Sequence, residues 1–87
     1  MRVFSGVGNF VHIATATTTQ ITTKDTVLER IIIQDGTVTI YDDPDSNDNL
    51  VLSVISASHE CGIYLKNGLR VVTAGAPTNV TIVYSEV

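Results

Sequence analysis

The residues of this chain that could take part in chemistry are two histidines, one cysteine and a cluster of aspartates. His59 and Cys61 stand two positions apart, so on a β-strand their side chains would share a face. With His12 they make three candidate zinc ligands, but a structural zinc site requires four, and no C-x-x-C spacing is present. A cysteine nucleophile would also need an orienting group and an oxyanion site. We therefore predict no metal and no catalytic residue here, and interpret Cys61 as a small buried apolar residue.

A second candidate is the acidic segment from Asp42 to Asn49. Its oxygen-bearing side chains alternate in the way a calcium loop begins, at Asp43, Asp45 and Asn47. The rest of the EF-hand pattern is missing, because Asp48 stands where that loop needs glycine and Val54 where it needs a bidentate glutamate. We interpret the segment as an exposed, mobile, metal-free loop in which Asp and Asn form turns. Calcium binding outside the EF-hand pattern stays open.

Charge and composition exclude several partners. The chain has five Lys and Arg against nine Asp and Glu, for a net charge of −4, and its positive residues are scattered rather than clustered. Nucleic acid is therefore not an expected partner. No apolar run approaches the roughly 18–20 residues of a membrane-spanning helix, so no membrane contact is expected. The Gly6-Val7-Gly8 sequence lacks a preceding strand and a third glycine, and no cofactor is predicted.

We expect these residues to lie on or between short β-strands. The chain has short runs rich in Val, Ile and Thr with period-two alternation, and no segment shows helical spacing. Strands are predicted at residues 10–17, 26–34, 37–41, 50–56, 63–66, 69–73 and 79–84, with 17–23 as an edge strand or an extended connection. Asp35-Gly36 and Asn67-Gly68 predict tight hairpin turns, since glycine supplies the positive φ angles.

This pattern predicts an all-β fold without significant helix. Seven or eight short strands favour a two-layer antiparallel β-sandwich, jelly-roll-like or immunoglobulin-like. Residues 1–87 would form one domain, with residues 1–9 as an extended N-terminal arm. The predicted core consists of Ile31, Ile33, Val38, Ile40, Leu52, Val54, Val71, Val80 and Ile82.

The chain is too apolar for a small free-standing monomer. It is 44% hydrophobic and 16% charged, whereas soluble domains average about 25% charged. A chain of this length buries only about 60–65% of its surface on folding, and a lone cysteine forms no internal disulfide. We therefore expect a homo-oligomer. The candidate contact residues are Val7, Phe10 and Val83, with Lys66 and Arg70 at the rim.

Three runs of the sequence resemble a known class of proteins. They are LERIIIQDGTVTIYDD at 28–43, LVLSVISA at 50–57 and NGLRVVTAGAPTNVTIVY at 67–84. They resemble the small β-sandwich structural proteins of tailed bacteriophages, which are capsid decoration and fibre- or tail-associated domains. The resemblance spans residues 17–84 at its widest. The chain departs from it at Lys24-Asp25-Thr26, where members often carry a glycine, and residues 1–10 match no part of the pattern.

The resemblance implies a non-enzymatic virion structural protein, foremost a capsid decoration or cement protein that binds the major capsid protein or other virion proteins. Such a protein would be made in the host cytoplasm and located on the capsid surface. Decoration proteins commonly sit on local threefold axes, which implies a homotrimer. The alternatives are a tail, neck or fibre component, and a carbohydrate-binding module that uses the acidic loop. No enzymatic activity is expected, because no pair of titratable groups is placed for acid–base work.

Overall fold

The structure of the chain is a computed structural model that describes residues 9–86, apart from the side chains of residues 56 and 57. Five strands make up the fold: β1 (Asn9–Ile13), β2 (Thr18–Thr22), β3 (Thr26–Tyr41), β4 (Leu50–Leu65) and β5 (Leu69–Glu86). The described residues contain no helix, so none there could span a membrane. The all-β prediction is confirmed. The predicted N-terminal arm and Val7 lie outside the described residues, except for Asn9.

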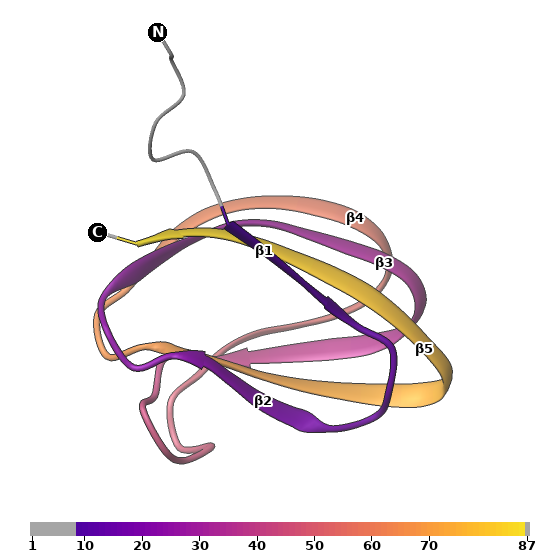
Figure 1. Ribbon diagram of the computed structural model, residues 1–87, viewed down its shortest axis with the longest axis horizontal. Coiled ribbons are helices and arrows are strands. Elements are labelled where there is room, and N and C mark those ends of the chain that lie inside the picture. Colours follow the sequence, from indigo (N-terminus) through magenta and orange to yellow (C-terminus); the bar gives the residue numbers. More distant parts are fainter. Residues whose placement is uncertain (1–8, 87) are drawn as a thin grey trace, which may run out of the picture.

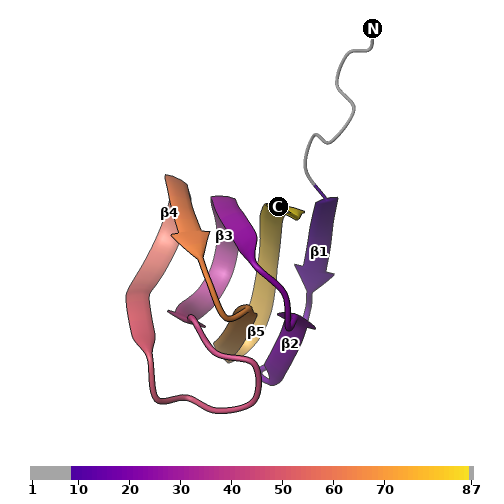
Figure 2. The same ribbon diagram turned by 90° about the vertical axis from the view of Figure 1, so that its left-hand side faces the viewer.

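All strand pairs are antiparallel, and the sheet has the order β1-β5-β3-β4. β2 also pairs with β5, next to its N-terminal part, whereas β1 lies along the C-terminal part of β5. The inner strands are therefore β3 and β5. Figure 2 shows β4 at one edge of the sheet and β1 with β2 at the other.

Three long strands replace most of the short strands predicted from the sequence. β3 includes both 26–34 and 37–41, β4 includes 50–56 and most of 63–66, and β5 includes 69–73 and 79–84. Each long strand bends, so that the two halves of the sheet face each other (Figure 1). Period-two alternation continues through such bends, and for this reason the sequence pattern alone divides one bent strand into two.

The hairpin predicted at Asp35-Gly36 is wrong, because the chain bends there without reversing. The ladder between β3 and β5 continues from Asp35↔Asn79 to Thr37↔Ala74, with a shift in register. Gly36 has φ 99°, and a side-chain carbon on it would lie 2.6 Å from the carbonyl oxygen of Ala74. Glycine at this position therefore allows a sharp bend with close backbone approach as well as a tight turn. The turn predicted at Asn67-Gly68 does connect β4 to β5.

The core lies between the two halves of the sheet. Seven of the nine predicted core residues are buried, while Leu52 and Val54 are partly buried against the core. The core also includes four residues that were not predicted: Ile13, Leu28, Leu65 and Leu69. Leu52 and Val54 remain partly exposed because they lie on β4, which has a strand on only one side.

Residues 14–17, which join β1 to β2, are fixed to the inner strand β5 by Thr73. The buried Thr73 hydroxyl donates to the carbonyl oxygen of Thr15 at 2.7 Å. The backbones of Thr17 and Thr73 exchange hydrogen bonds of 3.1 and 2.8 Å. β1 and β2 therefore act together as the edge that the sequence placed near residues 17–23.

Candidate interaction surface

The three candidate zinc ligands do not come together. His12 lies on β1, and its Nε2 donates a 2.6 Å hydrogen bond to Asn79 Oδ1, whereas His59 and Cys61 lie on β4 at the opposite edge. Within residues 9–86 no group of three or more His, Cys, Asp or Glu side chains could hold a metal ion.

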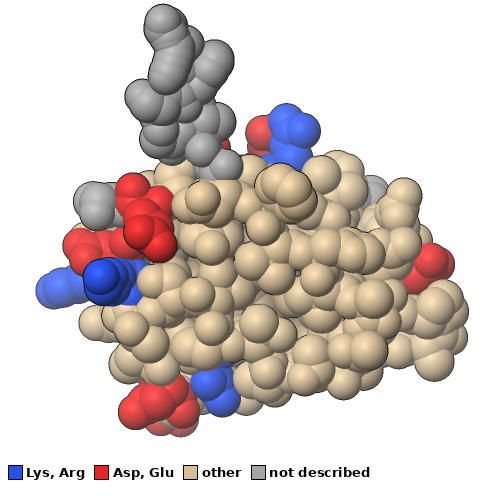
Figure 3. Space-filling model, viewed as in Figure 1, with Lys and Arg blue, Asp and Glu red and all other residues tan. Residues whose placement is uncertain are grey.

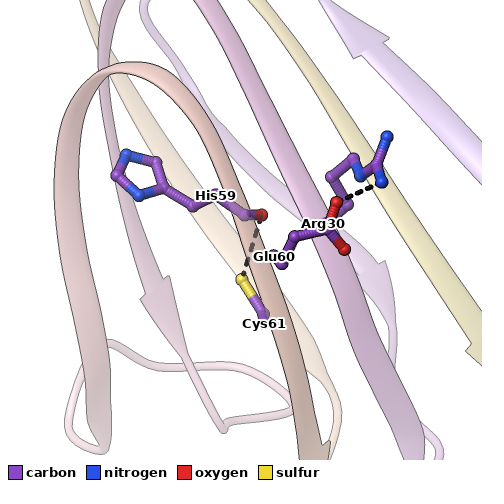
Figure 4. Close-up of polar contacts among 4 residues, drawn as sticks. All are labelled: Arg30, His59, Glu60 and Cys61. Carbon is purple, nitrogen blue, oxygen red and sulfur yellow. Dashed lines mark hydrogen bonds and ion pairs between the residues drawn. The ribbon is translucent and has the colours of Figure 1, made fainter.

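Cys61 is partly buried and packs against the core. Its thiol donates to the backbone carbonyl of His59 at 3.6 Å, and Figure 4 shows the His59 ring turned away from the thiol. Burial, and then the negative charge of Glu60, raises the pKa of the Cys61 thiol. The thiol is therefore protonated near neutral pH, which disfavours the thiolate that a nucleophile or a zinc ligand requires.

An open hollow of about 560 Å³ lies on the outer surface of β3, β4 and β5. Arg30 and Glu60 form an ion pair beside it, with side chains 48% and 74% exposed (Figure 4). Exposed pairs of this kind contribute only about 0–1 kcal/mol. Val27, Ile32 and Val83 contribute apolar side chains to the lining. A third charged residue of the lining, Glu29, accepts a hydrogen bond from the Ser85 hydroxyl.

The acidic loop is held in place by its own carboxylates. Asp43 is only 5% exposed and accepts hydrogen bonds from the backbone of Asn49 at 2.9 Å, the backbone of Asp48 at 3.2 Å and the hydroxyl of Ser46 at 2.9 Å. Burial alone would raise the pKa of Asp43, but these hydrogen bonds and the charge of Arg70 outweigh it and lower the pKa. The predicted exposure of the loop is therefore wrong at Asp43, whose carboxylate is turned inward, while residues 44–45 and 47–49 are exposed as predicted.

Two further contacts attach the loop to the sheet. Asp42 accepts hydrogen bonds from the backbone amides of Asn67 at 2.7 Å and Lys66 at 3.3 Å, which belong to the turn between β4 and β5. The amide group of Gln20, on β2, donates to the carbonyl oxygen of Asp43 at 2.8 Å. Through these hydrogen bonds the loop connects β2 with the turn between β4 and β5.

Arg70 belongs to the same network. Its guanidinium donates to Asn47 Oδ1 at 2.6 Å and to Gln20 Oε1 at 2.9 Å. It therefore joins β5 to the loop and to β2, and is engaged inside the chain. Of the two cations predicted to rim an interface, Lys66 is the one whose side chain is exposed.

The large hydrophobic residues that remain exposed are concentrated on the edge strands. Phe10 on β1 is 73% exposed, and on β4 Leu50 is 61%, Ile55 68% and Tyr64 54% exposed. The Cα partner of Phe10 is Val83, so these two predicted contact residues are neighbours. Soluble proteins protect edge strands with charged residues, proline or bulges. Here β1 and β2 carry no charged residue. β4 carries only Glu60, and its ladder with β3 has three register shifts, at Leu28/Arg30, Ile33/Thr37 and Ile40/Tyr41.

Both edges also leave the core partly uncovered. Val11 and Ile21 on one side, and Leu52, Val54 and Ile63 on the other, pack against the core while remaining partly exposed. Figure 1 views the molecule with β1 and β2 in front and β4 behind, and Figure 3 shows the same front face with charged side chains only around its margin. In the described part of the molecule, the side with β1 and β2 is therefore uncharged and rich in threonine, whereas the β4 side exposes apolar residues among polar ones.

Sequence reasoning identified Phe10 but not the exposed residues of β4. Leu50, Ile55 and Tyr64 alternate with core-facing residues in a strand rich in Val and Ile, and this pattern is also typical of a fully buried inner strand. Only the strand order shows that β4 is an edge. Comparisons of the chain with protein-family models, curated proteins and solved structures found no match.

Proposed function

We propose that this chain is a non-enzymatic structural protein of a tailed-phage virion, a capsid decoration protein that binds the major capsid protein on the outside of the head. In this role the two halves of the bent sheet serve as the two layers of a small β-sandwich. The sequence resemblance at 28–43, 50–57 and 67–84 suggests the class. The observation that carries the proposal is the group of large apolar side chains exposed on β4.

Leu50, Ile55 and Tyr64 are the anchors that we assign to the capsid. All three are exposed on β4, whereas Leu52 and Val54 of the same strand pack against the core. Protein interfaces have such an apolar centre surrounded by polar residues. A contact of about 800 Å² per partner, repeated over the many equivalent sites of a shell, stabilises the particle even when each contact is weak.

Sedimentation with phage heads that lack the protein tests this proposal. We expect the purified protein to sediment with the heads at saturating stoichiometry and to raise the temperature at which they release DNA. Ile55→Lys should weaken binding at least tenfold, because it places a charge in the apolar contact. Gln34→Lys adds the same charge at an exposed position of the inner strand β3 and is the matched control.

Three results would count against the proposal. Absence of association with heads would exclude the decoration role, and binding to isolated tails in place of heads would assign the chain to the tail. Equal head binding by Ile55→Lys and Gln34→Lys would show that β4 is not the contact.

A further inference from the structure

The face formed by residues 9–22 has a different character from the β4 side. We call it the β1–β2 face; it comprises β1, β2 and the segment that joins them. No Lys, Arg, Asp or Glu occurs between residues 9 and 23. Among the described residues, the charged side chains lie around the margin of this face (Figure 3). Its exposed large apolar side chain is Phe10, whereas Val11 and Ile21 are partly exposed and pack against the core. The other exposed residues of the face are alanine and uncharged polar residues, most of them threonine.

We propose that the β1–β2 face binds the same face of a second copy of this chain, giving a twofold-symmetric dimer. This proposal rests on the proposed virion role in one respect: the dimer leaves the second edge, β4, free to bind the capsid. The carrying observation is that, among residues 9–86, this face presents no charged side chain, contains strands paired on one side only and leaves part of the core uncovered.

The distribution of charge on the molecule favours a second copy of the chain as the partner of this face. Each copy carries a net charge of −4, and exposed like charges repel over a Debye length of about 8 Å at physiological ionic strength. Two copies therefore approach most favourably through the face where neither presents a charge. A basic partner, in contrast, would be drawn to the acidic margin of the molecule and not to this face.

The β1–β2 face lies on the broad side of the molecule. The molecule measures 40 × 27 × 17 Å, and the face is part of the side seen along the shortest of these axes (Figure 1). The 40 × 27 Å outline of this whole side leaves room for the ~800 Å² per partner of a standard interface. Pairing of β1 with the same strand of the second copy would satisfy the unpaired backbone groups of the edge and cover Val11 and Phe10.

The position of the two edges favours a twofold pair over a ring of three. A threefold ring joins two different faces of each copy, and those faces must be inclined to each other for the ring to close. The β1–β2 face and the β4 edge lie on opposite sides of a molecule only 17 Å thick (Figure 2). Joining them head to tail would build an open stack, whereas pairing of like faces closes after two copies.

Charge substitutions at Phe10 test the dimer. The exposed side chain of Phe10 can be replaced without loss of core packing, so Phe10→Lys and Phe10→Glu should each fold, with unchanged far-UV circular dichroism. In sedimentation equilibrium at 50–100 µM (about 10–100 times an interface of micromolar Kd), we expect a dimer for the wild-type protein and a monomer for each variant. An equimolar mixture of the two variants should form heterodimers, because opposite charges then meet across the twofold axis.

Two variants at other positions make the test specific. Gln34→Lys is the control for added charge and should remain dimeric. Ile55→Lys should also remain dimeric, and its dissociation to monomers would overturn the proposal in favour of a head-to-tail contact through β4. A monomeric wild-type protein, or dimeric Phe10→Lys, would overturn it as well.

The failure of this inference can be distinguished from the failure of the proposed virion role. A wild-type monomer that still sediments with heads would refute the dimer and leave the decoration role intact. A dimer that Phe10→Lys dissociates, but that binds no phage head, would support the dimer and refute the role.

Discussion

The inner strands and the edge strands of this small protein differ in the number of strands beside them and in how far their large apolar side chains are buried. β3 and β5 have a neighbour on each side and supply most of the buried core, including Leu28, Ile31, Val71 and Ile82. The edge strands β1 and β4 each have one neighbour and carry the exposed Phe10 and Ile55. The inner strands therefore supply most of the buried core of one copy, and the edges are the surfaces that we propose bind other molecules.

The acidic loop is like the inner strands in that several of its groups have their contacts within the same chain. Although it is composed of polar residues, its carboxylates accept hydrogen bonds from within the chain. The edge strands, in contrast, carry the exposed large apolar side chains of Phe10, Leu50, Ile55 and Tyr64. Polarity alone therefore does not tell which parts of this chain face a partner. What matters is whether a group has its contacts within the same copy.

The largest loss of stability is expected at the bend of β3. Gly36→Ala forces a side chain into a backbone with φ 99° and to within 2.6 Å of the Ala74 carbonyl oxygen. The backbone conformation alone costs about 1–3 kcal/mol, and the close contact adds to it. Gly62→Ala is the control, because a side-chain carbon there meets nothing within 4 Å. Urea unfolding should show a clearly larger loss for Gly36→Ala, and equal losses would contradict the close approach at the bend.

The next effect is expected in the acidic loop. Asp43→Ala removes the acceptor of three hydrogen bonds and should lower the melting temperature by several degrees. Asp45→Ala, at an exposed position in the same loop, should leave it nearly unchanged. Differential scanning calorimetry of both variants compares them directly. Equal melting temperatures would mean that the loop is as loosely attached as its composition suggests.

A smaller effect is expected from acid. The pKa of Asp43 lies below its ordinary value of 3.8 in the folded protein, so folding favours the ionised carboxylate. This contribution is fully present above about pH 4 and is lost as the pH falls through the lowered pKa. Between pH 6 and pH 3 the melting temperature of the wild-type protein should therefore fall more than that of Asp43→Asn. Parallel decreases in the two proteins would contradict the lowered pKa.

The smallest effect is expected at the edge. Ile55→Lys should change the free energy of unfolding by no more than about 0.5 kcal/mol, because the side chain is 68% exposed and contributes little to the core. Chemical denaturation of a variant that has lost head binding would measure this. A loss of 2 kcal/mol or more, the size expected of a buried residue, would place Ile55 among the stabilising residues and remove the contrast with the inner strands.

Much of the fold could be predicted from local pattern, and less of the site. Alternation identified the strands and seven core residues, because one face of each strand is buried. It could not show that residues 34–36 continue one strand through a bend, since Asp-Gly suits a hairpin equally well. The inward turn of Asp43 depends on hydrogen bonds formed within its own loop, which composition does not reveal. The exposure of Leu50 and Tyr64 depends on strand order, which pairing distant in sequence determines.

The claim that one edge serves self-association can be tested by hydrogen exchange of backbone amides, measured on the wild-type protein at dimer-forming concentration and on Phe10→Lys under the same conditions. We predict that amides of β1 and β2 exchange at least tenfold more slowly in the wild-type protein, while those of the inner strands and the acidic loop are unchanged. Equal exchange in β1 and β2 of both proteins, or a difference located in β4, would contradict the assignment of the β1–β2 face to a second copy.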